Sequence, residues 1–178
     1  MHSISKLIVF EFLERIGEKF PQGVSLYLLG GSALCIIGNP RVTNDIDYTF
    51  GNPIPNENTL DTIIQNVATQ MDLDVESVPL GEFIPLPAES SSRRKYVGRY
   101  GNLEVYIFDL YSIAISKIAR GFDSDIEDVL FLLKKNLIDF DRLEKFISEI
   151  SPKMIRSDID PTEFVTYFNE LRKQWFKG

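Results

Sequence analysis

The sequence predicts an α+β protein, in which a short mixed β-sheet flanked by helices precedes a helical C-terminal region. In residues 1–109, apolar runs of strand length alternate with runs in which apolar residues recur at helical spacing. Residues 110–178 contain four successive helical patterns with acidic or serine caps. With 178 residues and 44% apolar content the chain can bury a core, and we expect the helical region to pack on the first part as one compact unit.

Periodicity and chain breakers define the elements of the first part. Apolar residues at helical spacing predict a helix over 3–19, with Ser3 as its N-cap. The apolar run 24–29 reads as a strand that ends at Gly30-Gly31. The next expected elements are a short helix over 32–37, a strand over 45–50, a loop over 51–58 and a helix over 60–71.

The remaining elements follow in the same way. Residues 72–92 hold three prolines and a serine run, which suits a strand followed by a mobile loop. Residues 94–109 read as a hairpin with Gly101-Asn102 at its turn. The four C-terminal helices are expected within 110–122, 125–136, 139–150 and 160–176.

Composition excludes several classes of function. A single cysteine, Cys35, excludes an internal disulfide and a multi-cysteine zinc site, and His2 as the only histidine argues against His-dependent triads. No apolar run reaches the ~20 residues that span a bilayer, and the N-terminus does not read as a signal peptide, so we expect a cytoplasmic protein. The net charge of −7 argues against a general nucleic-acid coat protein but leaves room for a local basic groove.

Two aspartates stand two residues apart at the start of the strand over 45–50. Residues at this spacing point to the same face, so the carboxylates of Asp45 and Asp47 project together with their β-carbons roughly 6–7 Å apart. Mg²⁺ binds such carboxylates and keeps open positions for phosphate oxygens. Ile46 points the other way, into the core. The pattern predicts a metal-binding edge with a hydrophobic anchor behind it.

A glycine turn precedes this strand. Gly30, Gly31 and Ser32 allow a phosphate to approach the backbone, and a helix that begins at Ser32 directs N–H groups at an anion. Arg41 and Thr43 are candidates for further phosphate or orientation contacts. A glycine pair alone is usually only a turn, and Asp-x-Asp alone is common in surface loops. Their combination across a short helix is more specific and indicates a nucleotide site.

The segment "GGSALCIIGNPRVTNDIDYTF" resembles the signature of the DNA-polymerase-β-like nucleotidyltransferase superfamily. Its Arg-x-Thr-x-Asp-Ile-Asp form is close to the minimal nucleotidyltransferases and abortive-infection toxin-type nucleotidyltransferases of prokaryotes. A second segment, "DLYSIAISKIARGFDSDIEDV", is similar to a helical part of that group, in which Lys-[apolar]-x-Arg-Gly precedes Asp-x-x-Asp. The resemblance therefore implies a nucleotidyltransferase fold over 1–109 and a helical region over 110–178.

The resemblance implies Mg²⁺- or Mn²⁺-dependent transfer of a nucleoside monophosphate from an NTP to an acceptor, with release of pyrophosphate. It assigns the metals to Asp45 and Asp47 and the triphosphate to the glycine turn. The implied acceptor is an RNA such as tRNA, or a protein, although the sequence also leaves a small molecule open, and the resemblance makes the chain a candidate toxin with an antitoxin partner. The alternative is an inactive nucleotide- or partner-binding regulatory protein with the same fold.

In some toxin-type relatives a helical lysine and a following aspartate also act, which correspond here to Lys117 and to Asp125 or Asp128. A lone lysine on an otherwise apolar helix is more often solvated, and its charge is then expected to emerge at an edge. Asp125 is alternatively a helix cap.

A third carboxylate is expected from the resemblance, and the sequence offers Glu104, Asp109 and Asp128 for it. Glu104 shares a strand face with Tyr106 and Phe108, which is alternatively a solvated face. Asp109 stands where the N-cap of the next helix is expected.

A basic run lies in the predicted hairpin, made of Arg93, Arg94, Lys95 and Arg99. It is either a solvated hairpin or a groove for NTP phosphates or a nucleic-acid acceptor, with Arg94 as a substrate contact. The neighbouring Pro/Ser-rich loop is a candidate lid over the substrate.

Overall fold

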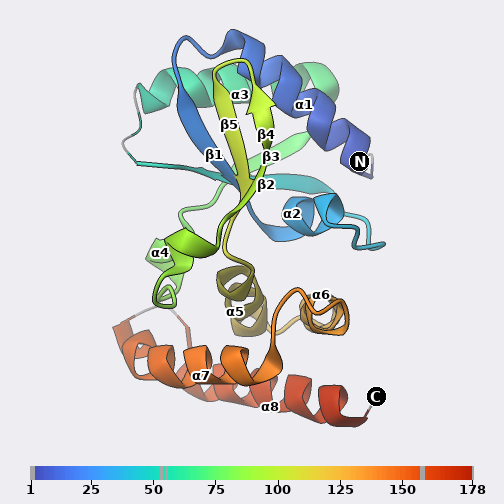
Figure 1. Cartoon of the computed structure of the whole chain (residues 1–178), viewed down its shortest axis with the longest axis vertical. Coiled ribbons are helices and arrows are strands. Elements are labelled where there is room, and N and C mark those ends of the chain that lie inside the picture. The colour runs from blue at the N-terminus through green and yellow to red at the C-terminus, as the bar shows by residue number, and fades with distance from the viewer. Residues whose placement is uncertain (1–2, 53, 55, 157–158, 178) are drawn as a thin grey trace. The chain divides into compact units, whose positions relative to one another are not determined.

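The structure is a computed structural model of the chain (Figure 1), and it describes residues 3–52, 54, 56–156 and 159–177. His2 and two positions of the expected loop, 53 and 55, lie outside the described residues. Contacts divide the chain into two compact units. The first, the sheet unit, comprises Met1–Val78 and Arg94–Phe108, and the second, the helical unit, comprises Pro79–Arg93 and Asp109–Gly178.

The sheet unit contains five strands, in the order β3-β2-β1-β5-β4. The strands are β1 (Val24–Leu28), β2 (Asp45–Phe50), β3 (Asp74–Ser77), β4 (Lys95–Tyr100) and β5 (Leu103–Ile107). β1 is antiparallel to β2 and parallel to β5, β2 and β3 are parallel, and the β4–β5 hairpin is antiparallel. The predicted α+β class with a mixed sheet is confirmed, as are the strand over 45–50 and the hairpin.

Two helices, α1 (Lys6–Lys19) and α3 (Glu57–Met71), lie side by side on one side of the sheet (Figure 1). The ring of Phe20, which follows α1, packs on that of Phe50 in β2, with 6.4 Å between centroids. Side chains of β2 alternate between buried and half-buried, as expected for a strand with one covered face. The predicted N-cap Ser3 is wrong, because the cap is Ser5, whose Oγ accepts a hydrogen bond from the N–H of Ile8 at 3.4 Å.

The short helix α2 (Gly30–Ile36) begins two residues earlier than predicted. Leu29 is extended, and its carbonyl accepts the first helical hydrogen bond, from the N–H of Ala33, at 2.9 Å. The two glycines are therefore the first turn of the helix and not a turn before it. Gly30 has φ +51°, a left-handed conformation that a glycine adopts without strain.

The proline-rich stretch after β3 contains more structure than its composition suggests. A short helix, α4 (Leu80–Phe83), and a 3₁₀ turn, η1 (Ser90–Arg93), interrupt the expected loop. These residues group with the helical unit, so the first structural unit does not run continuously to residue 109.

The helical unit contains the four predicted helices. They are α5 (Leu110–Arg120), α6 (Asp123–Lys134), α7 (Phe140–Ile150) and α8 (Pro161–Lys177), with a 3₁₀ segment η2 (Ser151–Arg156) before α8. Over the described part of the chain, every helix is too short or too polar to cross a membrane.

Candidate active site

Asp45 and Asp47 lie on the half-buried face of β2, opposite to the buried Ile46 and Tyr48. The prediction that the two carboxylates share one face is confirmed. The Thr43 hydroxyl donates a hydrogen bond to Asp45 Oδ1 at 3.0 Å. Thr43 itself is buried, and its carbonyl accepts from the N–H of Ile4 at 2.9 Å. Thr43 is therefore fixed in place and orients the first carboxylate.

The glycine turn packs directly against these groups. A methyl group added at Gly30 would overlap the carboxylate of Asp47, and one added at Gly31 would overlap the hydroxyl of Thr43. The N–H of Leu29 donates to the carbonyl of Asp47 at 2.9 Å, which joins the end of β1 to β2. The structure thus brings together the two halves of the predicted nucleotide site, and it gives the glycines a second role, because only they admit the aspartate and threonine side chains.

Ser32 and Arg41 stand beside this turn. The Ser32 side chain is fully buried, and its hydroxyl donates to the carbonyls of Leu29 at 2.9 Å and Asp47 at 3.3 Å. Its observed role is thus to hold α2 against β2, and a contact with phosphate stays a prediction. Arg41 is half-buried, and its backbone N–H donates to Asn39 Oδ1 at 3.1 Å.

Arg94 lies on the same side of the sheet as the two aspartates. Its guanidinium is 4.1 Å from the ring centroid of Tyr27 and 5.4 Å from that of Phe108. Tyr27 pairs with Thr49, which is two residues from Asp47, and directly opposed residues point to the same face. We call this face, which bears Asp45, Asp47 and Thr49, the aspartate face. The Arg94 Nε is buried, and the described residues give it no hydrogen-bond partner.

Glu104 is also on the aspartate face but far from the aspartates. Glu104 is opposite Ser25 of β1. Ser25 comes four residues before Leu29, and it is Leu29 whose N–H donates to the carbonyl of Asp47. Four residues of strand span about 13 Å, so Glu104 cannot bind the same metal ion as Asp47 in this structure. Among the described residues no three Asp, Glu, His or Cys side chains gather to hold a metal. At the level of Asp47, the residue that directly follows β5 is instead Phe108, which carries an aromatic ring.

Asp109 is the N-cap of α5, as its position in the sequence indicated. One oxygen accepts from the N–H and hydroxyl of Ser112, at 3.2 and 2.7 Å. The carboxylate also forms a two-point ion pair with Arg93, at 2.8 and 2.9 Å. With its side chain fully buried and both oxygens engaged, Asp109 serves the helical unit's own structure.

Lys117, Asp125 and Asp128 form a buried ion-pair cluster between α5 and α6. The Lys117 ammonium donates to Asp125 at 3.1 Å and to Asp128 at 2.7 Å, and each side chain is at most 2% exposed. Arg120 binds Asp125 from outside, at 2.6 Å. The expectation that the lysine charge emerges at a helix edge is wrong, because two carboxylates neutralise it inside. Asp125 lies within α6, whose N-cap is Phe122. A catalytic role for Lys117 or Asp125, or a metal-binding one for Asp128, stays a prediction.

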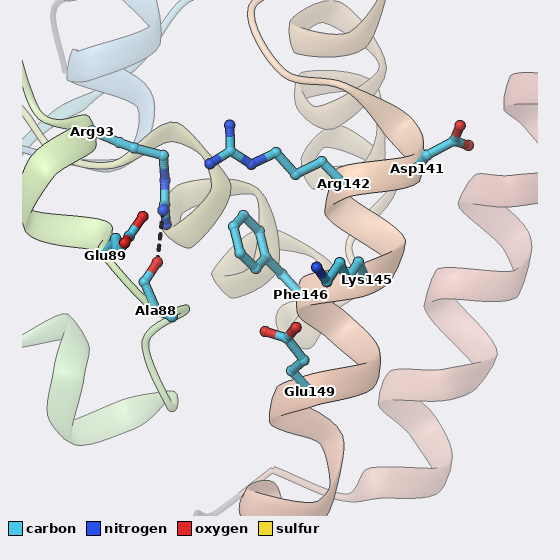
Figure 2. A pocket seen from close by; sticks show the side chains of 8 residues that line it. All are labelled: Ala88, Glu89, Arg93, Asp141, Arg142, Lys145, Phe146 and Glu149. Atoms are coloured by element: carbon cyan, nitrogen blue, oxygen red, sulfur yellow. Dashed lines mark hydrogen bonds between the residues drawn. The ribbon is translucent and has the colours of Figure 1, made fainter.

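A pocket of about 520 Å³ opens beside α7 in the helical unit (Figure 2). Figure 2 shows the side chains of Arg93 and Arg142 next to the Phe146 ring. Both guanidinium groups lie over this ring, at 4.7 and 5.4 Å from its centroid. The lining also carries Lys145 and three acidic residues, so its formal charge balances. The basic run of the sequence is therefore divided: Arg93 supports the helical unit, and Arg94 lies on the aspartate face.

The donor set at the aspartates fits Mg²⁺ or Mn²⁺. Mg²⁺ is usually bound by one or two carboxylates together with substrate phosphates, and not by a complete protein cage. Asp45 and Asp47 provide two hard oxygen donors on one face, one of them oriented by Thr43. The first N–H groups of α2 have no partners within the helix, and they lie next to Asp47.

A glycine turn packed on an Asp-x-Asp strand in a mixed sheet defines the class of protein that the sequence resemblance indicated, a nucleotidyltransferase. The chain belongs to a family described as a nucleotidyltransferase of unknown function (DUF6036), which it matches over residues 7–176. No curated protein and no solved structure gives a significant match. The finer resemblance, to polymerase-β-like and toxin-type enzymes, stays a prediction.

The sequence reasoning missed a row of tyrosines on the aspartate face. Tyr27, Tyr106 and Tyr96 come from three different strands and are brought side by side only by the strand order. The available signal was that Tyr106 alternates with buried residues in β5. This alternation indicated which strand face Tyr106 is on, but not which strands lie beside β5. Burial raises the pKa of Tyr106, and the nearby Glu104 carboxylate raises it further, so its hydroxyl stays protonated at neutral pH.

Proposed function

We propose that this protein transfers a nucleoside monophosphate from an NTP to an acceptor hydroxyl at the aspartate face, in a reaction that depends on Mg²⁺ or Mn²⁺. The observation that carries the proposal is the contact between the Asp47 carboxylate and Gly30. This contact joins the carboxylate pair to a backbone turn made of two glycines. A carboxylate pair and such a turn are the two parts needed to hold a metal–triphosphate.

Each group of the site has a distinct task in this proposal. Asp45 and Asp47 hold the metal, which supplies charge neutralisation and orientation for the triphosphate. Thr43 fixes Asp45 through its hydrogen bond. The backbone N–H groups of Gly30 and Gly31, at the start of α2, bind phosphate oxygens. Arg94 adds a positive charge held in place by two aromatic rings.

The chemistry is one substitution at the α-phosphorus. The acceptor hydroxyl oxygen forms a bond to the α-phosphorus, and the bond from that phosphorus to the bridging oxygen of the β-phosphate breaks. Pyrophosphate leaves with the electron pair, and the hydroxyl proton passes to water. Binding and orienting the two reactants supplies most of the rate enhancement expected of such a site.

One further part of the proposal rests on the sequence alone. A toxin role with an antitoxin partner comes from the resemblance to toxin-type enzymes. The competing function is an inactive nucleotide- or partner-binding protein with the same fold. It is favoured by one observation, the lack of a third carboxylate beside Asp45 and Asp47 among the described residues.

Label transfer tests the proposal. The protein is incubated with Mg²⁺, each α-³²P-labelled NTP in turn, and total RNA or cell lysate as acceptor, beside the double variant Asp45→Ala/Asp47→Ala. We expect label on an RNA or protein band that the double variant does not produce. Mg²⁺-dependent NTP binding without transfer would instead establish the inactive binding protein.

A further inference from the structure

Three tyrosines form a row across the aspartate face. Tyr27 of β1 pairs with Tyr106 of β5, which pairs with Tyr96 of β4. The ring centroids are 5.6 Å apart between Tyr27 and Tyr106 and 5.4 Å apart between Tyr106 and Tyr96. Tyr96 is 60% exposed and lies on an edge strand. The row therefore runs from the middle of the sheet to an open edge.

The tyrosine row lies between the aspartates and a pocket on the same face. Tyr27 is opposite Thr49, and Thr49 is two residues from Asp47. The tyrosine row is therefore about 7 Å from Asp47 along the strand. On the other side, Ser25 pairs with Glu104 and Glu104 with Arg99. These three line a pocket of about 470 Å³, together with Asn52 and Tyr27 itself. The face thus presents a metal site, a row of rings and a polar pocket in succession.

This succession fits a strand of unpaired nucleotides. Tyr96 is exposed and Tyr106 is half-buried. Tyr27, in contrast, is 8% exposed and lies under the Arg94 guanidinium. Exposed aromatic rings on a sheet stack bases, and they do so for every base because each has a π-face. The guanidinium groups of Arg94 and Arg99 are on the same face and complement backbone phosphates. The pocket offers a hydroxyl, an amide and a carboxylate, which are suited to the ribose 2′-hydroxyl as donor and acceptor. A folded protein acceptor would have less use for stacking rings and a polar pocket of this size.

We propose that the acceptor is single-stranded RNA, which lies across the tyrosine row with its terminal hydroxyl at Asp45 and Asp47 and an upstream nucleotide in the pocket lined by Ser25, Arg99 and Glu104. This inference rests on the proposed function, because it names the acceptor of that reaction. Tyr96 at the open edge is the most exposed ring of the row, and its substitution removes a contact with the half-buried ring of Tyr106 but no fully buried packing.

Fluorescence anisotropy with a 5′-labelled ten-nucleotide single-stranded RNA tests the proposal in the absence of NTP and metal. Loss of one stacked base weakens binding by about tenfold or more, so we expect that effect for Tyr96→Ala. Tyr96→Phe keeps the ring and should bind within about twofold of the natural protein. Phe176→Ala is the matched control, since Phe176 is an exposed aromatic residue, at 70%, in the helical unit. Its RNA affinity should not change.

Three outcomes would overturn the proposal. The first is RNA binding that Tyr96→Ala leaves unchanged, which would put the RNA elsewhere. The second is DNA of the same sequence binding more tightly than RNA. The third is that the natural protein does not bind RNA. In that case either label is transferred to a protein band, or Tyr96→Ala weakens the binding of NTP alone.

The same experiment separates this proposal from the proposed function. Asp45→Ala/Asp47→Ala should abolish transfer, and the added substitution Tyr96→Ala should still weaken RNA binding about tenfold in that background, because stacking needs no metal. RNA binding that depends on Tyr96, without transfer from any NTP, would refute the transferase and retain the RNA site. Transfer to a protein would refute the RNA acceptor and retain the transferase.

Discussion

The two carboxylate clusters of this chain differ in how far their side chains are buried. In the helical unit, Lys117 sits between Asp125 and Asp128 with at most 2% of any of the three side chains exposed. In the sheet unit, Asp45 and Asp47 are half-buried, and Asp45 forms no ion pair with another described residue, only a hydrogen bond from Thr43. The first cluster is therefore enclosed together with its own cation, whereas the second lies on a half-buried face that a metal can reach.

The contrast separates residues needed for folding from residues needed for chemistry. Breaking a buried ion pair is strongly destabilising, because it leaves an uncompensated charge in a low-dielectric interior. A half-exposed carboxylate pair gives little stability and becomes useful when a ligand binds. The resemblance placed catalytic residues in both clusters, and the variants below test whether the two clusters respond differently.

The largest expected effect is on the aspartate pair. Asp45→Asn/Asp47→Asn should reduce nucleotidyl transfer by about 10³- to 10⁵-fold, the range found when a charge-stabilising group is removed from a phosphoryl-transfer site. The melting temperature should change little, because both side chains are half-buried and take no part in the core. Steady-state transfer and thermal melts measure the two quantities. Wild-type transfer by this variant would refute the site.

Lys117→Met should act on stability. Removal of the ammonium leaves Asp125 and Asp128 buried without it, which costs about 3–5 kcal/mol of unfolding free energy. The triple variant Lys117→Met/Asp125→Leu/Asp128→Leu replaces the whole cluster with apolar groups and should recover most of that loss. Urea unfolding measures both. If Lys117→Met stays stable but loses transfer, the lysine is catalytic, as the resemblance implies.

Gly30→Ala should disturb the site more than its backbone strain alone explains. A left-handed residue other than glycine costs about 1–2 kcal/mol, and at Gly30 the added methyl also overlaps the Asp47 carboxylate. Gly38→Ala is the matched control, with φ +94° and open space around the position. We expect both variants to lose stability and only Gly30→Ala to lose transfer. Equal transfer by the two variants would contradict the role assigned to the Gly30–Asp47 contact.

Thr43→Val should have the smallest effect, on metal affinity. Without the hydroxyl, Asp45 loses its orienting hydrogen bond, and partners of metal ligands typically contribute 10- to 100-fold to affinity. We expect the Mg²⁺ concentration for half-maximal transfer to rise about tenfold, and Thr43→Ser to restore it. A Mg²⁺ requirement that does not change in Thr43→Val would show that Thr43 only packs against Gly31.

Local patterns predicted most of the fold. The strand over 45–50, the hairpin turn at Gly101-Asn102 and the four C-terminal helices follow from periodicity and caps, which act within a few residues. The start of α2 was misplaced because a glycine pair usually ends an element, whereas here an extended Leu29 caps the helix. The helical turns after β3 were concealed by three prolines.

The candidate site was predictable where its residues are close in sequence. Asp45 and Asp47 are two residues apart in a strand, and this spacing predicted that they share a face. The structure places the predicted glycine turn directly beside them. The burial of Lys117 was not predictable, because its partners lie on the next helix and one charged residue gives no sign of them. The tyrosine row depends on the pairing of β1, β5 and β4, which no short pattern specifies.

The central claim is that a metal–nucleotide binds at the aspartate pair and not at the buried cluster. Mn²⁺ with a non-hydrolysable NTP analogue, added to ¹⁵N-labelled protein, locates the metal through the broadening of nearby amide signals. Our account predicts that the signals of Gly30, Gly31, Asp45 and Asp47 broaden first and that those of Asp125 and Asp128 persist. Broadening centred on Asp125 and Asp128, or none at Gly30 and Asp47, would contradict it.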